Sequence, residues 1–392
     1  MKKIFQIITA CIFIFLMTAT GAATLYNSRA VIKGFAKERP KDGYRTAVEG
    51  MILDNFAEKT EWININGLFH RLMGTTIVRD NDYIVYKLSN GQIIYDLPKR
   101  DMTKHAARVK ALDEAVRDMG IEFMYVQLPF KAKDDSYMPL GTHGNGNENA
   151  DQMVSLLREQ GVNTLDIREL FEEQGRDWTE QFYNTDHHWR ETTAFWAAGE
   201  IMKKMKNDMG VDYSEEYYDE DSYELIRYDN YMLGAVGRRT GKFYAGLDDF
   251  VLFKPKYDTD FVFKARGNKK KDSLERSGSF YDTMYIWENL EKRADFDRNT
   301  YSTYTGKNFS RIDITNKKAN NGLRILIVRE SFTCALLPFI AVNAEHVTTV
   351  DLRHYKDKSI PELCEEVKPD IVLVNYNPSA FGKEQFNFFN EI

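Results

Sequence analysis

The chain has 392 residues, of which 43% are hydrophobic and 29% are charged, and its formal net charge is -6. This length predicts two or three structural units, and the hydrophobic content is too high for a disordered chain. The excess of 59 acidic over 53 basic residues argues against a nucleic-acid-binding protein, which needs many contacts to phosphate. The 22 tyrosines and 25 phenylalanines favour packed domains with aromatic surfaces, which suit neutral partners such as carbohydrates.

Residues 1–28 have the pattern of an export segment. Lys2 and Lys3 precede an uncharged stretch from Ile4 to Ser28, about 25 residues, which is long enough to cross a bilayer as a helix. The small residues at 21–23 also fit a signal-peptidase site, so a retained signal anchor and a cleaved signal peptide both remain open. In either case the lysines predict that the rest of the chain is extracytoplasmic, either membrane-anchored or secreted.

Residues 29–95 form a lead-in region in which we expect short strands and a helix. Asparagine-glycine turn signals occur at 66–67 and 90–91, and residues 83–86 form a strand-like run.

Predicted helices and strands alternate over residues 96–211, the first part of the main domain. Apolar residues recur at helical spacing over 104–120, and the apolar run 121–128 has the composition of a buried parallel strand. A helix at 153–160 and a strand at 163–167 follow. Such alternation is typical of an α/β fold whose parallel sheet has crossover connections and flanking helices.

Residues 212–321 interrupt this alternation. They are rich in Tyr, Asp and Lys, with strand-like runs at 250–253 and 260–263 and a solvated turn at 268–272, so we interpret them as a β-rich insertion. The alternation resumes in residues 322–392, the second part of the domain, with strands at 323–328, 346–351 and 370–375 and helices at 331–342 and 359–367. The predicted sheet is therefore assembled from two separated pieces.

The first candidate for chemistry is the run 183–189, a predicted loop that leads into a helix at 192–205. In a hydrolytic triad, Asp186 would orient His188, and His188 would act as the general base, with His187 as a spare imidazole. The structural alternative is a helix cap at Asp186 with two surface histidines. Zinc is disfavoured because adjacent histidines do not easily converge on one ion and no third ligand is evident.

The second candidate is Ser331, which follows the apolar strand 323–328 after a sharp turn and opens a helix. Sites in α/β sheets lie at the carboxyl ends of the strands, and the free amides at a helix start can bind an oxyanion. The alternative is an ordinary cap, a role for which serine is preferred. Each candidate makes the other more credible, since a catalytic base needs a nucleophile to activate and a serine nucleophile needs a base.

These two motifs, Asp186-His187-His188-Trp189 and Arg329-Glu330-Ser331-Phe332, resemble those of the DHHW family of exported bacterial proteins. That family is similar to alginate O-acetyltransferases of the AlgJ and AlgX type, which have SGNH-hydrolase-like domains with a permuted order of motifs. The resemblance covers residues 95–380. It implies an SGNH-hydrolase-like parallel sheet with a triad of Asp186, His188 and Ser331, supported by Trp189.

The resemblance also points to supporting residues. Relatives usually have aspartate before the serine, where this chain has Glu330, and residues 233–241 resemble a glycine-rich loop of the family that brings amides or Arg238 near the site. Arg353 resembles a family arginine near the serine, although a surface salt bridge is an equal alternative. Asn375 ends the last predicted strand, where its amide would assist the oxyanion.

The function that follows is transfer of an acetyl group by an exported serine O-acetyltransferase to hydroxyls of an extracellular polysaccharide or a cell-wall glycan. The resemblance implies a membrane-bound O-acyltransferase as partner, and no cofactor, metal or nucleic acid is expected. With water as acceptor the same triad would be a carbohydrate esterase. A non-catalytic glycan-binding surface protein, in which Ser331 is inert, is a third hypothesis.

Two of the three cysteines lie outside the export segment. In an exported chain, Cys334 and Cys364 could pair as a disulfide. The apolar helical pattern around Cys334 favours a buried free thiol instead.

Overall fold

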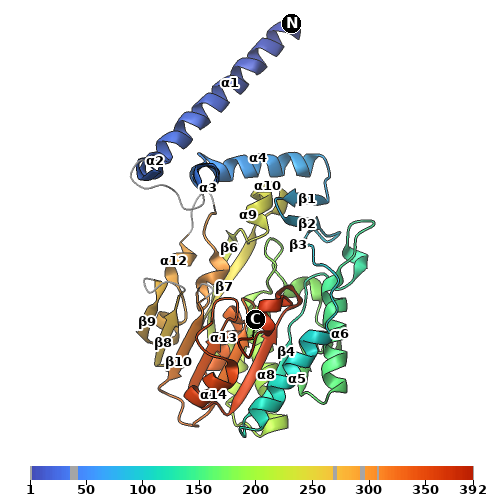
Figure 1. Ribbon diagram of the computed structural model, residues 1–392, viewed down its shortest axis with the longest axis vertical. Coiled ribbons are helices and arrows are strands. Elements are labelled where there is room, and N and C mark those ends of the chain that lie inside the picture. Colours follow the sequence, from blue (N-terminus) through green and yellow to red (C-terminus); the bar gives the residue numbers. More distant parts are fainter. Residues whose placement is uncertain (1, 36–42, 268–271, 292–295, 307–308, 392) are drawn as a thin grey trace.

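The computed structural model describes residues 2–35, 43–267, 272–291, 296–306 and 309–391. Its centre is an eight-stranded sheet with the order β5-β4-β13-β11-β12-β10-β8-β9 (Figure 1). The first five strands are parallel: β5 Thr164–Asp166, β4 Glu122–Gln127, β13 Ile371–Tyr376, β11 Arg324–Arg329 and β12 His346–Val350. The other three continue the sheet in antiparallel fashion: β10 Arg311–Asn316, β8 Phe261–Arg266 and β9 Leu274–Gly278.

Helices cover both faces of the parallel half, because its strands carry apolar side chains on both sides. In β4, Phe123 and Tyr125 belong to one buried cluster, and Met124 and Val126 belong to the other. The first cluster includes side chains of α5 Thr103–Arg117, α6 Asn145–Glu159 and α14 Ile360–Val367. The second includes side chains of α7 Ile167–Glu173, α8 Glu191–Met209 and α13 Thr333–Ala341. The predicted α/β fold is therefore confirmed.

Three helices of this domain differ from their predicted bounds. The helix α6 begins at Asn145 rather than 153, because its first turns face the interior with polar side chains such as Asn147, whose amide donates to backbone carbonyls. The short helix α7 was not predicted, since it buries only two side chains. The helix α13 begins at Thr333, two residues after the predicted start, so Ser331 lies in the turn before it.

The segment 212–321 contributes to the central sheet as well as to a separate hairpin. Its strands β6 Tyr223–Met232 and β7 Asp248–Pro255 pair only with each other, whereas β8, β9 and β10 form the antiparallel half of the main sheet. The predicted strands at 250–253 and 260–263 lie on β7 and β8. The predicted turn at 268–272 lies outside the described residues except for Asp272. The short helices are α9 Gly237–Thr240, α10 Lys242–Ala245, α11 Phe280–Thr283 and α12 Trp287–Leu290.

The amino-terminal region contains more helix than predicted. It consists of α1 Lys2–Asn27, α2 Arg29–Phe35, α3 Gly43–Asn55 and α4 Lys59–Leu72, followed by a three-stranded sheet of β1 Ile77–Asp80, β2 Tyr83–Lys87 and β3 Ile93–Tyr95. The single expected helix is wrong because α3 and α4 bury few apolar side chains and show no clean apolar face in sequence. Within α1, the 25 residues Lys3–Asn27 are long and apolar enough to cross a membrane.

Cys334 and Cys364 are free and buried on opposite faces of the sheet, in α13 and α14. The free thiol favoured by the sequence at Cys334 is confirmed, and these two residues form no disulfide.

The contact between α4 and the short helix α10 depends on a glycine. A Cβ atom at Gly67 would lie 2.3 Å from the carbonyl oxygen of Thr240 and 3.2 Å from Cβ of Tyr244. Beside it, the side chain of Asn64 accepts a hydrogen bond from the backbone N–H of Lys242, at 2.9 Å. The helix α4 therefore approaches the domain as closely as its backbone allows.

We expect Gly67→Ala to lower the free energy of unfolding by about 1–3 kcal/mol, because the new methyl group meets backbone atoms rather than a flexible side chain. Gly50→Ala on α3 is the matched control, since nothing lies within 4 Å of a Cβ there. That variant should be neutral or more stable by about 0.5–1 kcal/mol. Denaturant unfolding in one detergent compares the two, and equal stabilities would contradict the packing argument.

Candidate active site

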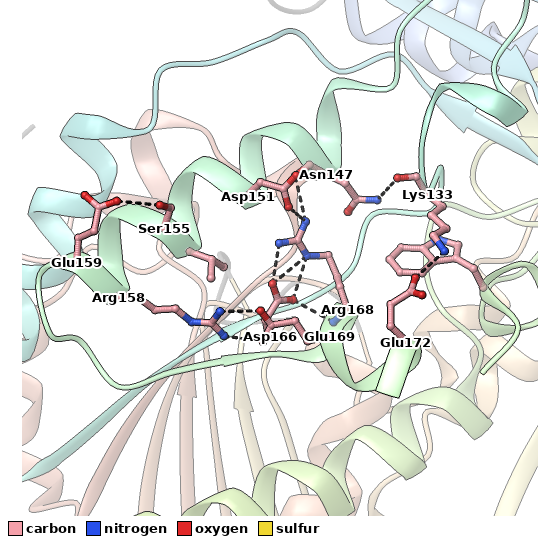
Figure 2. Close-up of a pocket in the computed structure, with 12 residues that line it drawn as sticks. Lys133, Asn147, Asp151, Ser155, Arg158, Glu159, Asp166, Arg168, Glu169 and Glu172 are labelled. Carbon is pink, nitrogen blue, oxygen red and sulfur yellow. Dashed lines mark hydrogen bonds and ion pairs between the residues drawn. The ribbon is translucent and has the colours of Figure 1, made fainter. Parts of the chain in front are cut away.

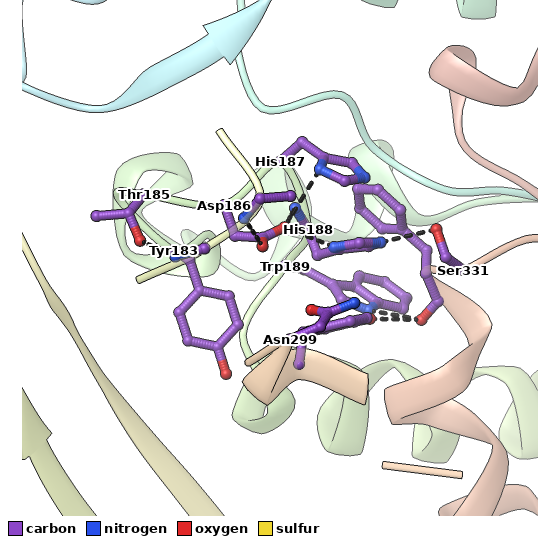
Figure 3. Close-up of polar contacts among 12 residues, drawn as sticks. Tyr183, Thr185, Asp186, His187, His188, Trp189, Asn299 and Ser331 are labelled. Atoms are coloured by element: carbon purple, nitrogen blue, oxygen red, sulfur yellow. Dashed lines mark hydrogen bonds and ion pairs between the residues drawn. The ribbon is translucent and has the colours of Figure 1, made fainter. Parts of the chain in front are cut away.

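Three predicted residues meet at the carboxyl edge of the parallel strands. Ser331 lies in the turn after β11, and Asp186 and His188 lie in the loop before α8. The Nε2 atom of His188 is 2.7 Å from Oγ of Ser331, although the two residues are 143 positions apart in sequence. Its Nδ1 atom is 2.6 Å from Oδ1 of Asp186 (Figure 3). The structure therefore brings together a carboxylate, an imidazole and a hydroxyl in the order that a catalytic triad requires.

The carboxylate of Asp186 is fully buried and hydrogen-bonded at both oxygens. Its Oδ1 accepts the backbone N–H of His188 at 3.1 Å, and its Oδ2 accepts the backbone N–H of Ala235 at 2.6 Å. Burial alone would raise the pKa of Asp186, but electrostatic interactions with His188 and His187 together with these hydrogen bonds hold it well below its usual value. The carboxylate therefore stays ionised and keeps His188 oriented.

The glycine-rich loop predicted at 233–241 supplies this amide. A Cβ atom at Gly234 would lie 2.4 Å from Cβ and 2.6 Å from Cα of Asp186, so only glycine lets the loop approach. Arg238 does not point its charge at Asp186. Its Nη1 donates instead to the backbone carbonyls of Leu233 and Arg298, at 3.2 and 3.0 Å. Arg238 thus shapes the loop, and the backbone of the loop makes the contact.

A buried lysine holds the other side of the Asp186 loop. Nζ of Lys131 donates to the carbonyl oxygens of Ile93, Asn184 and Asp186 at 2.8 to 2.9 Å. Burial lowers the pKa of Lys131 to about 7, although the negative charges of Asp248 and Asp186 raise it in part. The loop is thereby fixed to β3.

Asp248, at the start of β7, fixes the loop from the segment 212–321. Its two carboxylate oxygens accept the backbone N–H groups of Asn184 and Thr185, each at 2.7 Å. It also accepts the hydroxyl of Thr185, which in turn accepts the N–H of Gly234. The loop, the hairpin and the glycine-rich segment therefore form one hydrogen-bonded unit.

Aromatic rings fix the imidazole of His188. The Tyr301 ring stacks on it at 3.8 Å and 8°, and the His187 ring lies 3.8 Å from it. Trp189 Nε1 and the Tyr301 hydroxyl both donate to the carbonyl of Phe332, at 3.0 and 3.1 Å. The residues that position the base thus also hold the backbone immediately after Ser331.

The turn at Ser331 is closed by the preceding glutamate. Oε2 of Glu330 accepts the backbone N–H of Phe332 at 3.0 Å and lies 3.3 Å from Oγ of Ser331. Burial raises the pKa of Glu330. The hydrogen bond from the N–H of Phe332 and electrostatic interactions with His188 and Arg353 oppose that rise. Glu330 therefore closes the turn at the position where the family resemblance led us to expect an aspartate. The N–H of Ser331 has no hydrogen-bond partner in the described part of the chain, so it is available to an oxyanion.

The other predicted residues lie close to this turn. Arg353 makes two hydrogen bonds to Asp351, at 3.0 and 2.6 Å, so it forms the salt bridge that was the alternative prediction. Its positive charge also lowers the pKa of Glu330 and of His187. Asn375 faces Arg329 in the adjacent strand, fully buried, and its amide atoms have no partner among the described residues. Its role at the oxyanion stays a prediction.

The cluster Asp186, His187 and His188 brings its potential ligand atoms within 4.8 Å of one another, which raises the question of a metal. Both ring nitrogens of His188 are hydrogen-bonded to Asp186 and Ser331, so a bound cation would have to displace the triad contacts. Burial and the neighbouring His188 lower the pKa of His187 to about 3, which keeps that ring neutral. The geometry favours proton transfer over metal binding.

Sequence reasoning missed Lys131, Asp248 and Tyr301. Lys131 follows the strand 121–128 at the edge where Ser331 was expected, and this position was a usable signal. Asp248 and Tyr301 lie in the segment 212–321, whose pattern gave no indication of where its residues would meet the domain.

Two cavities lie near the domain edge, and neither is lined by a triad residue. The cavity of about 550 Å³ between α6 and α7 is lined by charged groups that pair with one another, such as Arg158 with Glu169 and Arg168 with Asp166 (Figure 2). No triad residue lines it.

The second cavity, about 640 Å³, lies between the helices α3 and α4 and the domain. It is lined by Phe56, Trp62, Tyr95, Ala235 and Arg238 among others. Ala235 holds Asp186, and the Tyr95 ring lies 5.7 Å from that of His187. This second cavity, called the α4 cleft below, therefore ends beside the triad.

Comparison with known proteins gives the same fold. Residues 93–246 match the family of the SGNH hydrolase-like domain of the acetyltransferase AlgX, which confirms the resemblance drawn from the motifs. No curated protein matches the sequence.

Solved structures extend the likeness to most of the chain. PatB1 of Bacillus cereus with a sulfonyl adduct is 19% identical, with a TM-score of 0.65, over 79% of this chain and 99% of that one. A DHHW family protein from Eubacterium siraeum is 17% identical, with a TM-score of 0.58, over 79% and 95%. The O-acetyltransferase domain of Pseudomonas putida AlgJ is 11% identical, with a TM-score of 0.42, over 77% and 96%.

We expect Gly234→Ala to displace Asp186 and with it His188, because the new methyl group would overlap the backbone of Asp186. The rate of p-nitrophenyl acetate cleavage should fall about 100-fold, as for other small displacements of reacting groups. Gly144→Ala is the control, since the nearest atom to its Cβ is 3.5 Å away. A rate for Gly234→Ala equal to that of the control would show that the loop does not position the carboxylate.

Proposed function

We propose, from the likeness to the SGNH hydrolase-like AlgX family and from the arrangement of Asp186, His188 and Ser331, that this protein is an extracytoplasmic serine O-acetyltransferase. It would transfer an acetyl group to hydroxyls of an extracellular polysaccharide or a cell-wall glycan. The observation that carries the proposal is the 2.7 Å contact between His188 and Ser331, completed by the 2.6 Å contact to Asp186. Helix capping alone requires neither of these contacts.

In the first half of the reaction, the acetyl donor acylates Ser331. With its own proton on Nδ1, His188 accepts the Ser331 hydroxyl proton at Nε2 while Oγ attacks the donor carbonyl carbon. The resulting oxyanion lies within reach of the Ser331 N–H at the start of the α13 turn. His188 then returns the proton to the departing oxygen or sulfur, the bond to the donor breaks, and the acetyl group stays on Ser331.

In the second half, a sugar hydroxyl replaces the donor. His188 takes the proton of that hydroxyl, the sugar oxygen attacks the acetyl carbon, and the proton passes back to Oγ of Ser331 as the ester to the enzyme breaks. With water in place of the sugar, the product would be free acetate, which is the esterase alternative. Binding of an acceptor and exclusion of water decide between the two outcomes.

A retained anchor fits the structure better than a cleaved signal peptide. The helix α1 runs without a break through the small residues 21–23. Its last turns contact the folded chain, where Thr24 Oγ1 accepts the N–H of Ala57 at 3.0 Å and both Thr24 and Ser28 are buried. We therefore propose that the domain lies at the outer surface of the membrane. An acetyl donor brought across the bilayer by a membrane-bound O-acyltransferase would reach it there.

We expect Ser331→Ala and His188→Ala to reduce p-nitrophenyl acetate cleavage to background, and Asp186→Asn to reduce it at least about 10³-fold, because the carboxylate sets the tautomer of His188. Ser277→Ala, an exposed serine on β9, is the control and should keep the wild-type rate. Intact-mass analysis should also find an acetyl adduct on Ser331. Equal rates for all four variants would exclude the triad and favour the non-catalytic glycan binder.

Transfer is tested with an acceptor. We expect acetylation of an oligosaccharide acceptor, seen as a mass gain of one acetyl group, to depend on Ser331 and His188. If these variants abolish activity but the wild type releases only acetate with every acceptor, the protein is an esterase and the transferase proposal fails.

A further inference from the structure

The helix α4 carries an apolar stripe that no other part of the described chain covers. The stripe consists of Ile65, Leu68, Phe69, Leu72 and Met73, which are between 39% and 74% exposed. Their spacing of three and four residues puts them on one side of the helix. The side chain of Asn64 and the backbone at Gly67 face the domain instead, against α9 and α10. The stripe is therefore not the packing face of α4.

The helix α3 also exposes apolar side chains. Tyr44, Val48 and Ile52, spaced four residues apart, are exposed as well. Contiguous exposed apolar surface of this kind usually marks a binding face.

The position of α4 identifies what covers the stripe. Ala57, two residues before α4 begins, donates its N–H to Thr24 in the last turn of α1, and the side chain of Asn27 contacts the carbonyl of Asn55. The start of α4 thus lies at the level where the membrane-crossing helix ends. From there α4 runs across the top of the domain, between the domain and α1 (Figure 1). At about 1.5 Å per residue, its 14 residues cover about 21 Å along that surface.

The charges of α4 agree with a lipid surface. Its one acidic residue, Glu61, points to Lys242 at 3.8 Å and contacts Asn64, and so faces the domain. The basic residues Lys59 and Arg71 near its two ends donate to backbone carbonyls of the protein, so no charged side chain of α4 interrupts the stripe.

We propose that α3 and α4 form a membrane-interface platform, with the apolar stripe of α4 inserted among the lipid head groups and the adjoining acyl chains. This inference rests on the proposed retention of α1 as an anchor. A second side of α4, through Ile63 and Asn66, lines the α4 cleft. The platform therefore holds the α4 cleft, whose lining residue Ala235 donates to Asp186, at the bilayer surface, where an acyl donor delivered from the membrane emerges.

The test uses the full-length chain in phosphatidylcholine and phosphatidylglycerol vesicles, with Cys11→Ala as background because Cys334 and Cys364 are buried. An environment-sensitive fluorophore is placed on Leu68→Cys, Leu72→Cys or, as control, Met119→Cys. Met119 is 39% exposed, as Leu68 is, and lies at the amino-terminal edge of the sheet, opposite Ser331. Cleavage of p-nitrophenyl acetate by each labelled protein shows that the domain is folded.

We expect brominated acyl chains to quench the labels at 68 and 72 at least about twofold and to leave the label at 119 unchanged. Equal behaviour at all three positions would overturn the proposal. Protection of 68 and 72 only after a membrane protein partner is added would overturn it too, in favour of a protein contact. Flotation with the vesicles tests the anchor separately. If the protein floats with the vesicles but its labels are not quenched, the anchor proposal is supported and the platform proposal is wrong.

Discussion

The buried carboxylate of Asp186 is the constraint on which the rest of the site depends. A charge with no exposure to water is stable only if hydrogen bonds and opposite charges replace its hydration. Here the N–H of Ala235, the backbone and ring of His188 and the nearby Lys131 do so, and they come from three separate segments of the chain. The same contacts that stabilise the charge also aim the imidazole at Ser331. Stability and reactivity of the site therefore depend on one set of interactions.

The sequence predicted the parts of the fold whose signal is local. The runs 121–128, 323–328 and 370–375 are mostly apolar over a whole strand because both faces of that part of the sheet are covered, and these strands formed, as did the more polar strand predicted at 346–351. The helix α7 escaped notice because it buries little. The helices α3 and α4 were not both predicted, because their exposed apolar residues do not follow the pattern of a soluble domain.

The site was predictable only in part. Asp186, His188 and Ser331 lie in loops that lead into helices, which drew attention to them, but no local pattern joins residues 143 positions apart. The family resemblance supplied that link. Lys131 and Asp248 bind backbone groups of the loop. Because nearly every residue type has the same backbone carbonyl and amide, the sequence of the loop does not show that these contacts exist.

The order of strands has a consequence for when the site can exist. The last strand of the chain, β13, lies between β4 and β11, and β4 and β11 do not pair with each other. Among the described strands, the part of the sheet that contains β4 and the part that contains β11 therefore join through residues 371–376. During synthesis, these two parts cannot form one sheet until residues 371–376 have left the ribosome. A chain that is terminated before residue 371 would lack the strand that joins them.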